Sequence, residues 1–160
     1  MKERLISINV TEYSLEEVPD WIKQLVDLSI EAANSAYAPY SKFKVGAAVL
    51  LANGEIIKGS NQENAAYPSG LCAERVAVFY SQSAFPDQSI KAISISAFNN
   101  GNRTQEPIFP CGSCRQVLLE NEQIHNSKIT LIFSGAGKIL VVNSASDLLP
   151  LNFNADSLNI

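Results

Sequence analysis

The sequence predicts an α/β domain in which helices pack on a mixed sheet of about five strands. Three observations lead to this prediction. Several segments have helical periodicity, an Asn-Gly pair separates two strand-like runs, and short apolar runs rich in Val and Ile follow in the second half. In chain order the elements are helix, hairpin, helix, strand, helix, strand and strand. This order is typical of a layered α/β fold.

The first helix is expected to begin near a capping box and to end before a proline. Ser14 and Glu17 have the spacing of a capping box, and Pro19 suits the first helical turn. Apolar residues then recur with a helical period to about Tyr37, and Pro39 ends the helix.

The remaining elements follow the same two periodicities. Asn53-Gly54 is a strong hairpin signal, and it predicts paired strands at 44–51 and 55–59. Further elements are expected as helices at 72–83 and 111–121 and as strands at 89–98, 129–133 and 138–142. The only histidine, His125, is expected in a polar loop after the last helix.

The N-terminal segment before the first helix has no assigned role. In residues 4–10, Ile6, Ile8 and Val10 alternate with Leu5, Ser7 and Asn9, so this segment could form either a short strand or an extended arm. We treat residues 1–16 as an N-terminal extension of a single domain that spans residues 1–160, because no linker or repeat interrupts the chain.

Composition excludes several classes of protein. A hydrophobic fraction of 46% with 18% charged residues is typical of a globular domain, and a net charge of −4 argues against a basic nucleic-acid-binding face. No segment has the ~20 apolar residues of a membrane span. Three cysteines fit reduced thiols better than a disulfide framework, which favours the cytoplasm.

The cysteines lie in two short segments that together suggest a catalytic zinc site. Cys72 is followed two residues later by Glu74, and Cys111 and Cys114 lie three apart at the start of a predicted helix. Three thiolates leave the fourth position of a tetrahedral Zn²⁺ open, as in catalytic sites, and the carboxylate beside them suits an acid/base. The alternatives are three buried thiols, or a structural zinc closed by His125.

An arginine next to each cysteine segment bears on the charge of such a site. Three thiolates around Zn²⁺ carry one excess negative charge, which a guanidinium hydrogen-bonded to sulfur would withdraw. We expect Arg75 rather than Arg115 to face a sulfur in this way. The alternative for Arg75 is an ion pair at the surface.

With these motifs in place, the sequence resembles the small homotetrameric cytidine deaminases from about residue 36 to residue 158. The resemblance is carried by YAPYSKFKVGAA (37–48), GSNQENAAYP (59–68), CAER (72–75), PCGSCRQ (110–116) and LLP (148–150). It implies a three-layer α/β/α fold with one Zn²⁺ per subunit, bound by Cys72, Cys111 and Cys114. It also implies that Glu74 transfers protons.

The resemblance further assigns residues to a nucleoside substrate. Asn61 and Glu63 match a pair that holds the ribose, although by themselves they would also suit a polar turn. Phe43 matches an aromatic residue that packs on the pyrimidine, and the backbone N–H of Ala73 matches a donor to the carbonyl oxygen of the base.

Two aromatic residues match positions that approach the site from neighbouring subunits, Tyr67 and, more loosely, Phe153. The resulting hypothesis is hydrolytic deamination of cytidine and deoxycytidine in pyrimidine salvage by a homotetramer. It involves no nucleic acid or membrane partner. Two alternatives stay open: a deaminase of another cytosine-containing small molecule, and a non-catalytic zinc-stabilised binding module. No residue in the sequence distinguishes a ribose with a 2′-hydroxyl from one without it, so the sequence does not decide between cytidine and deoxycytidine.

Overall fold

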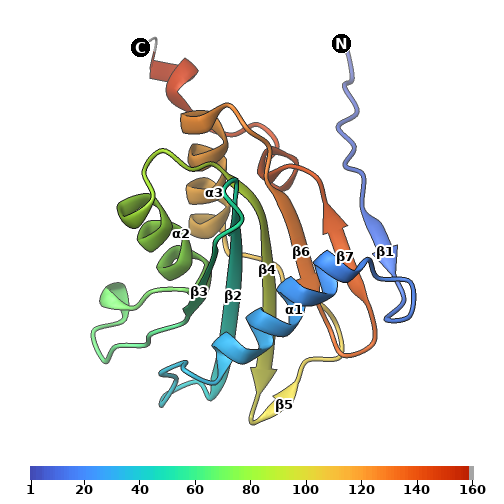
Figure 1. Cartoon of the computed structure of the whole chain (residues 1–160). Helices are drawn as coiled ribbons and strands as arrows, with labels where there is room; N and C mark the ends of the chain where they lie inside the picture. The colour runs from blue at the N-terminus through green and yellow to red at the C-terminus, as the bar shows by residue number, and fades with distance from the viewer. Residues whose placement is uncertain (159–160) are drawn as a thin grey trace.

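The computed structural model describes residues 1–158 and contains one mixed sheet with helices on both faces (Figure 1). Six strands follow the order β1-β7-β6-β4-β2-β3, and β5 pairs with β4 outside this path. Strands β4 and β6 are parallel, and the other pairs are antiparallel. The strands are β1 (Thr11–Tyr13), β2 (Phe43–Leu51), β3 (Ile56–Ser60), β4 (Ile90–Asn99), β5 (Asn102–Arg103), β6 (Thr130–Ser134) and β7 (Ile139–Val142).

The expected number of about five strands was therefore too low. All five strands expected from the sequence are present, and the two additional ones, β1 and β5, are three and two residues long. Strand β1 exists because β7 offers a free edge to it, and β5 follows a tight turn at Asn100-Gly101, where both φ angles are positive. Strand β1 has no local sequence signal of its own, whereas the Asn100-Gly101 pair before β5 is the same kind of hairpin signal as Asn53-Gly54.

The helices form the two outer layers expected of an α/β/α fold. Helix α1 (Asp20–Ala33) crosses one face of the sheet, and α2 (Ala73–Ala84) and α3 (Gly112–His125) are neighbours on the other (Figure 1). Three short 3₁₀ helices, η1 (Tyr67–Ser69), η2 (Ala145–Leu148) and η3 (Ala155–Leu158), connect or follow these elements. None of the helices in residues 1–158 is both long and apolar enough to cross a membrane.

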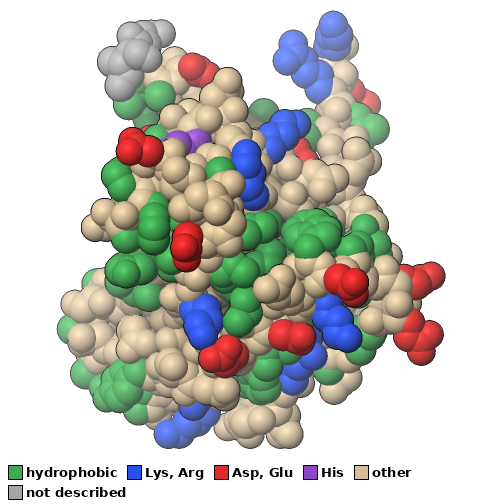
Figure 2. Space-filling model, viewed as in Figure 1, with side chains coloured by type: hydrophobic (Ala, Val, Ile, Leu, Met, Phe, Trp, Pro, Cys, Tyr) green, Lys and Arg blue, Asp and Glu red, His purple; other side chains and the backbone are tan. Residues whose placement is uncertain are grey.

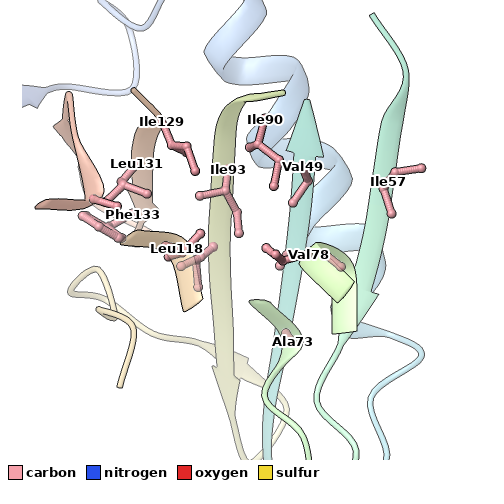
Figure 3. Packing of buried hydrophobic residues seen from close by; sticks show 14 of the residues in the cluster. Val49, Ile57, Ala73, Val78, Ile90, Ile93, Leu118, Ile129, Leu131 and Phe133 are labelled. Carbon is pink, nitrogen blue, oxygen red and sulfur yellow. The ribbon is translucent and has the colours of Figure 1, made fainter. Parts of the chain in front are cut away.

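Alternation along β4 separates the core into two clusters. Ala92 faces α1 and packs with Ile22 and Leu25, whereas Ile93 and Ile95 face the opposite layer. On that side the cluster includes Ala73, Ala77 and Val78 of α2, Leu118 of α3, and Leu131 and Phe133 of β6 (Figure 3). The sheet is thus buried on both faces, which fits the apolar runs of its central strands.

The ends of two helices differ from the expectation. Ser14 donates to the Glu17 carboxylate at 2.8 Å, but this contact closes a turn, and α1 begins only after Pro19 and ends at Ala33 rather than near Tyr37. Helix α3 continues to His125, which is therefore in its last turn and not in a loop. Its end is set by Asn126, which adopts a left-handed conformation.

A buried carboxylate holds the end of α3 to the sheet. Glu122 accepts hydrogen bonds from the backbone N–H groups of Ile129 and Ala145, both at 2.7 Å, and from the Ser144 hydroxyl at 2.9 Å. These contacts join α3 to the start of β6 and to η2. They fix the axis of the helix whose other end carries Cys111 and Cys114.

A glycine sets how closely α2 approaches the sheet. A Cβ atom at Gly59 of β3 would lie 2.6 Å from the carbonyl oxygen of Ala73 and 2.6 Å from the backbone nitrogen of Ala77. The contacted atoms belong to the helix backbone, so they can yield only if α2 moves. The first two turns of α2 are therefore held against β3 by the absence of a side chain.

We expect Gly59→Ala to lower the free energy of unfolding by about 1–3 kcal/mol, because the added methyl overpacks the α2–β3 contact. Thermal denaturation followed by circular dichroism measures this change. Gly137→Ala is the matched control, because a Cβ there meets no atom within 4 Å, and it should keep the wild-type Tm. Equal Tm values for the two variants would contradict the close packing of α2 on β3.

Candidate active site

Three cysteine sulfurs meet where α2 and α3 begin. Cys72 is the N-cap residue of α2, Cys111 is the N-cap residue of α3, and Cys114 lies in the first turn of α3. The sulfur atoms are 3.8 Å apart between Cys72 and Cys111 and 3.5 Å apart between Cys111 and Cys114, and all three lie within 4.8 Å of one another. The chain between Cys72 and Cys111, which are 39 positions apart, is thereby closed into a loop.

This spacing fits a zinc ion. Zn–S bonds of about 2.3 Å in tetrahedral geometry place neighbouring sulfurs about 3.8 Å apart, close to the distances observed here. Both N-cap residues have extended backbones that direct their side chains toward the positive end of a helix, which favours thiolates. Within residues 1–158, no His, Asp or Glu joins the three cysteines in this group.

The pKa values of two thiols in the cluster, Cys72 and Cys114, are shifted in opposite directions. Hydrogen bonding from the Cys114 thiol, together with the Arg75 guanidinium, outweighs burial and lowers the pKa of Cys72 to about 5. The pKa of Cys114 is raised, because its proton bonds to Cys72 and because the thiol is buried beside Glu74. A bound divalent cation would favour the thiolate form of the cysteines that hold it.

Glu74 is buried beside the sulfurs. It is the second residue of α2 and only 5% exposed, and its carboxylate lies against the Cys114 thiol. Burial raises the pKa of Glu74, and the Cys72 thiolate raises it further. The carboxyl group is therefore easier to protonate than an exposed glutamate, as an acid/base that accepts and later donates a proton requires.

The two arginines have different surroundings. Arg75 directs Nη2 toward the Cys72 sulfur at 3.9 Å, the arrangement expected for a guanidinium that withdraws charge from sulfur. Arg115 instead donates from Nε to the carbonyl oxygen of Pro110 and from Nη1 to that of Leu148, each at 2.9 Å. Arg115 thus holds the segment before Cys111 against η2.

A pocket of about 720 Å³ opens in front of the cysteine cluster. Its walls come from the start of β2, the segment after β3, the start of α2 and the segment before α3. All of the substrate-binding candidates from the sequence line it, namely Phe43, Asn61, Glu63 and Ala73, together with Tyr67, Cys72, Glu74, Arg75 and Cys111. The motifs at 37–48, 59–68, 72–75 and 110–116 therefore all line one cavity.

Asn61 is bonded to the start of β2 through both the oxygen and the nitrogen of its side-chain amide. Its Oδ1 accepts from the Val45 N–H at 2.7 Å, and its Nδ2 donates to the Phe43 carbonyl at 2.9 Å. The amide continues the β2–β3 ladder beyond its last backbone pair, and it positions the backbone of Phe43 at the pocket. The oxygen and nitrogen each keep one further hydrogen-bonding site.

Glu63 is held by the loop that precedes β2. Its Oε2 accepts from the backbone N–H of Tyr40 at 2.9 Å and from that of Ser41 at 3.3 Å. Hydrogen bonds from the Ser41 side chain and these two amides lower the pKa of Glu63, so the carboxylate is ionised near neutral pH. It presents an acceptor for hydroxyl groups at the exposed side of the pocket.

Of the two residues expected to approach a neighbouring subunit's site, only Tyr67 lines the pocket of its own chain. Tyr67 lies at the rim of the pocket, 78% exposed, with its ring centroid 6.4 Å from that of Tyr40. Phe153 is 61% exposed and does not line the pocket of its own chain. Its backbone carbonyl accepts a hydrogen bond from Gln116 Nε2 at 3.0 Å.

Two groups of pocket residues had no role assigned from the sequence. Tyr40 and Ser41 belong to the 37–48 motif, and their amides are recognisable as Glu63 partners only once the fold is known. Ile108 and Phe109 form an apolar wall, and the Phe109 ring packs edge-on at 5.0 Å against Phe133. In the sequence, the only sign of this wall is that two apolar residues directly precede Pro110-Cys111.

Comparison with known proteins agrees with this geometry. A family model described as the cytidine and deoxycytidylate deaminase zinc-binding region matches residues 19–129. The cytidine deaminase of Halalkalibacterium halodurans is 38% identical over 141 residues, which span 86% of this chain and 97% of that protein. That of Sporosarcina psychrophila is 36% identical, with coverages of 86% and 95%.

Solved structures lead to the same class. The crystal structure of a cytidine deaminase from Burkholderia pseudomallei superposes with a TM-score of 0.71 at 37% identity and covers 82% of this chain and 98% of that one. The three-layer fold and the cysteine cluster thus define a deaminase with a zinc-binding region. Within that class, the chain belongs to the cytidine deaminase family.

We expect Asn61→Asp to lower the free energy of unfolding by about 1–3 kcal/mol, because a carboxylate oxygen would face the Phe43 carbonyl where an amide now donates. Urea denaturation measures the change. Asn53→Asp is the control, since Asn53 uses only Oδ1, to accept from Glu55 N–H, and an aspartate can do the same. Similar losses in both variants would contradict the role of the Asn61 Nδ2 group.

Proposed function

We propose that this chain catalyses the zinc-dependent hydrolytic deamination of cytidine and deoxycytidine to uridine and deoxyuridine, with release of ammonia. The observation that carries the proposal is the shared pocket. It joins a three-sulfur cluster and a buried carboxylate to an apolar wall and a hydroxyl-binding carboxylate. Each chain contributes one catalytic domain, and the reaction serves pyrimidine salvage.

Cys72, Cys111 and Cys114 would hold one Zn²⁺ per subunit. When bound, the ion supplies a Lewis acid that lowers the pKa of water at its open position. Arg75 offsets part of the excess charge of three thiolates through its contact with the Cys72 sulfur. The net charge left on the site is therefore smaller than the sulfur count suggests.

Glu74 carries the proton during the reaction. It accepts a proton from the attacking water and passes it to N3 of the cytosine ring, which makes C4 electrophilic. It then delivers a proton to the exocyclic amine, which leaves C4 as ammonia. The raised pKa of the buried carboxyl suits this exchange, because the group must exist in both protonation states during one turnover.

The remaining pocket residues orient the nucleoside. Phe43 packs on the pyrimidine ring, and the N–H of Ala73, at the first position of α2 where no intrahelical acceptor is available, donates to the carbonyl oxygen of the base. Asn61 and Glu63 bind the ribose, particularly its 3′-hydroxyl. The ionised Glu63 accepts from a hydroxyl and would repel a phosphate at the same place.

This charge pattern favours a nucleoside over a nucleotide. Arg75 is the only lysine or arginine among the described residues that line the pocket, and it is directed to Cys72. A phosphate-binding pocket would need free cationic groups or a glycine-rich loop. Another cytosine-containing small molecule and a non-catalytic zinc-stabilised binding module are the alternatives that the experiment below separates.

The family resemblance also supports an assembly. We propose a cytoplasmic homotetramer, consistent with free thiols, in which Tyr67 and Phe153 approach the pockets of neighbouring subunits. Both side chains are mostly exposed in one chain, and Tyr67 lies at the rim of the pocket. Large apolar side chains that are exposed in one chain are the usual material of such interfaces.

The test of function follows the loss of the cytosine absorbance band, together with ammonia release, for cytidine, deoxycytidine, their monophosphates and free cytosine. Both nucleosides should be substrates, and the monophosphates should react far more slowly. Preference for a monophosphate would support another cytosine compound as substrate. Bound zinc with no ammonia from any compound would support the binding module.

We expect Glu74→Gln to retain zinc and to lose about 10²–10⁴-fold in turnover, because an amide cannot accept the proton. Steady-state deamination of cytidine, with zinc quantified in the same sample, measures both properties. Glu120→Gln makes the same change on the exposed surface of α3 and should leave turnover unaltered. Near-normal activity of Glu74→Gln would contradict its assignment.

We expect Cys111→Ala to lose zinc and much of its stability together, since the ion would join α2 to α3. Zinc content by mass spectrometry and thermal denaturation measure the two effects. Ser113→Ala, between the two α3 cysteines, is the control and should keep zinc and Tm. A zinc-free Cys111→Ala protein with the wild-type Tm would argue against a metal that stabilises the fold.

A further inference from the structure

The N-terminal arm, residues 1–13, is a part of the chain that the catalytic site does not use. It lies outside the region matched by the family model, which begins at residue 19. Residues 4–10 are extended but belong to no strand, and only 11–13 pair with β7 as β1. Figure 1 shows the arm leaving the body of the protein beyond this short pairing.

The arm exposes an apolar stripe with the period of a β-strand. Ile6, Ile8 and Val10 are 55%, 44% and 46% exposed, and they alternate with polar Ser7 and Asn9. Isoleucine and valine favour strands, and no proline or glycine interrupts the chain before Pro19. The arm therefore has the composition of a strand without the partner that a strand requires.

The sheet ends at the arm, because β1 is the last strand of the order and its outer edge is open. An open edge presents unpaired N–H and C=O groups that template pairing with another strand. No proline interrupts residues 1–13, and residues 1–10 belong to no strand within a single chain. The open edge of β1 and the apolar stripe of Ile6, Ile8 and Val10 together form one continuous surface to which another strand can be added.

The sequence of the arm is complementary to itself in antiparallel orientation. When Ile8 lies opposite a second Ile8, Ile6 lies opposite Val10 on both sides of the axis. Arg4 then lies opposite Glu12, and the odd positions place no like charges together. Every apolar residue of the stripe is thereby paired with an apolar residue, and both ends of the stripe carry an ion pair.

The charged groups at both ends are available for this pairing. Arg4 lies in the protruding part of the arm, and Figure 2 shows cationic side chains at its free end. Glu12 is 4.0 Å from Lys138, whose closer partner is Glu106 at 2.9 Å, so Glu12 is only weakly engaged. Opposite charges placed directly across from each other stabilise a strand pair.

We propose that the arms of two copies of this chain pair antiparallel about a two-fold axis at Ile8 and join their sheets edge to edge through β1. A self-complementary strand is what an isologous two-fold contact requires, because each residue meets its counterpart in the same environment. The contact buries Ile6, Ile8 and Val10. It also closes the open edge of the sheet in both copies.

The register can be tested by disulfide trapping in the full-length, zinc-loaded protein. Ile8→Cys should crosslink under oxidised glutathione, because directly opposite residues of antiparallel strands have Cα atoms about 4.5–5.5 Å apart. Ile6→Cys is the matched control. In the proposed register its own counterpart is four residues away along the strand, about 13 Å, and it should not crosslink. The unmodified chain should also stay uncrosslinked.

A charge exchange tests the ends of the stripe. In the Ile8→Cys background, Arg4→Glu should slow crosslinking roughly tenfold, because two attractive pairs become repulsive. Arg4→Glu combined with Glu12→Arg should restore the original rate. Crosslinking of Ile8→Cys alone, together with this rescue, supports the pairing. Equal crosslinking of Ile6→Cys, no crosslinking of either variant, or no rescue overturns it and leaves the arm to a different partner.

Discussion

The meeting of the N-termini of α2 and α3 is the constraint on which the site depends. The two helices come from distant parts of the chain, yet their N-cap residues place Cys72 and Cys111 sulfurs 3.8 Å apart. Both helices are fixed at other points: α2 lies against β3 where Gly59 lacks a side chain, and the end of α3 is held by Glu122. A shift of either helix would separate the sulfurs.

The same arrangement gives Glu74 its chemical character. As the second residue of α2, it is carried into the protein beside the cysteine cluster, and burial raises its pKa. Glu63, at the open side of the same pocket, has its pKa lowered by Ser41 and two backbone amides. One pocket thus contains a carboxyl group suited to exchanging protons and another suited to accepting hydrogen bonds from a substrate.

Much of the fold and of the reacting centre could be predicted from the sequence, because the sequence signals for them are local. The central strands and the three helices follow from periodicity, and the cysteine and glutamate spacing marks the reacting centre. What could not be predicted depends on partners distant in sequence. Strand β1 needs the free edge of β7, the contact of Arg115 with Leu148 spans 33 residues, and His125 is helical only because α3 continues past its apolar segment.

The sequence by itself determined which residue types are available for metal and proton chemistry, since motif spacing is a property of a few adjacent residues. Only the tertiary structure decided how those residues are used. Asn61 bonds to the start of β2 through both amide atoms, and Arg115 bonds to the carbonyl oxygens of Pro110 and Leu148. These outcomes depend on where the backbone of other segments lies, because a hydrogen bond forms only with the acceptor or donor that folding brings within reach.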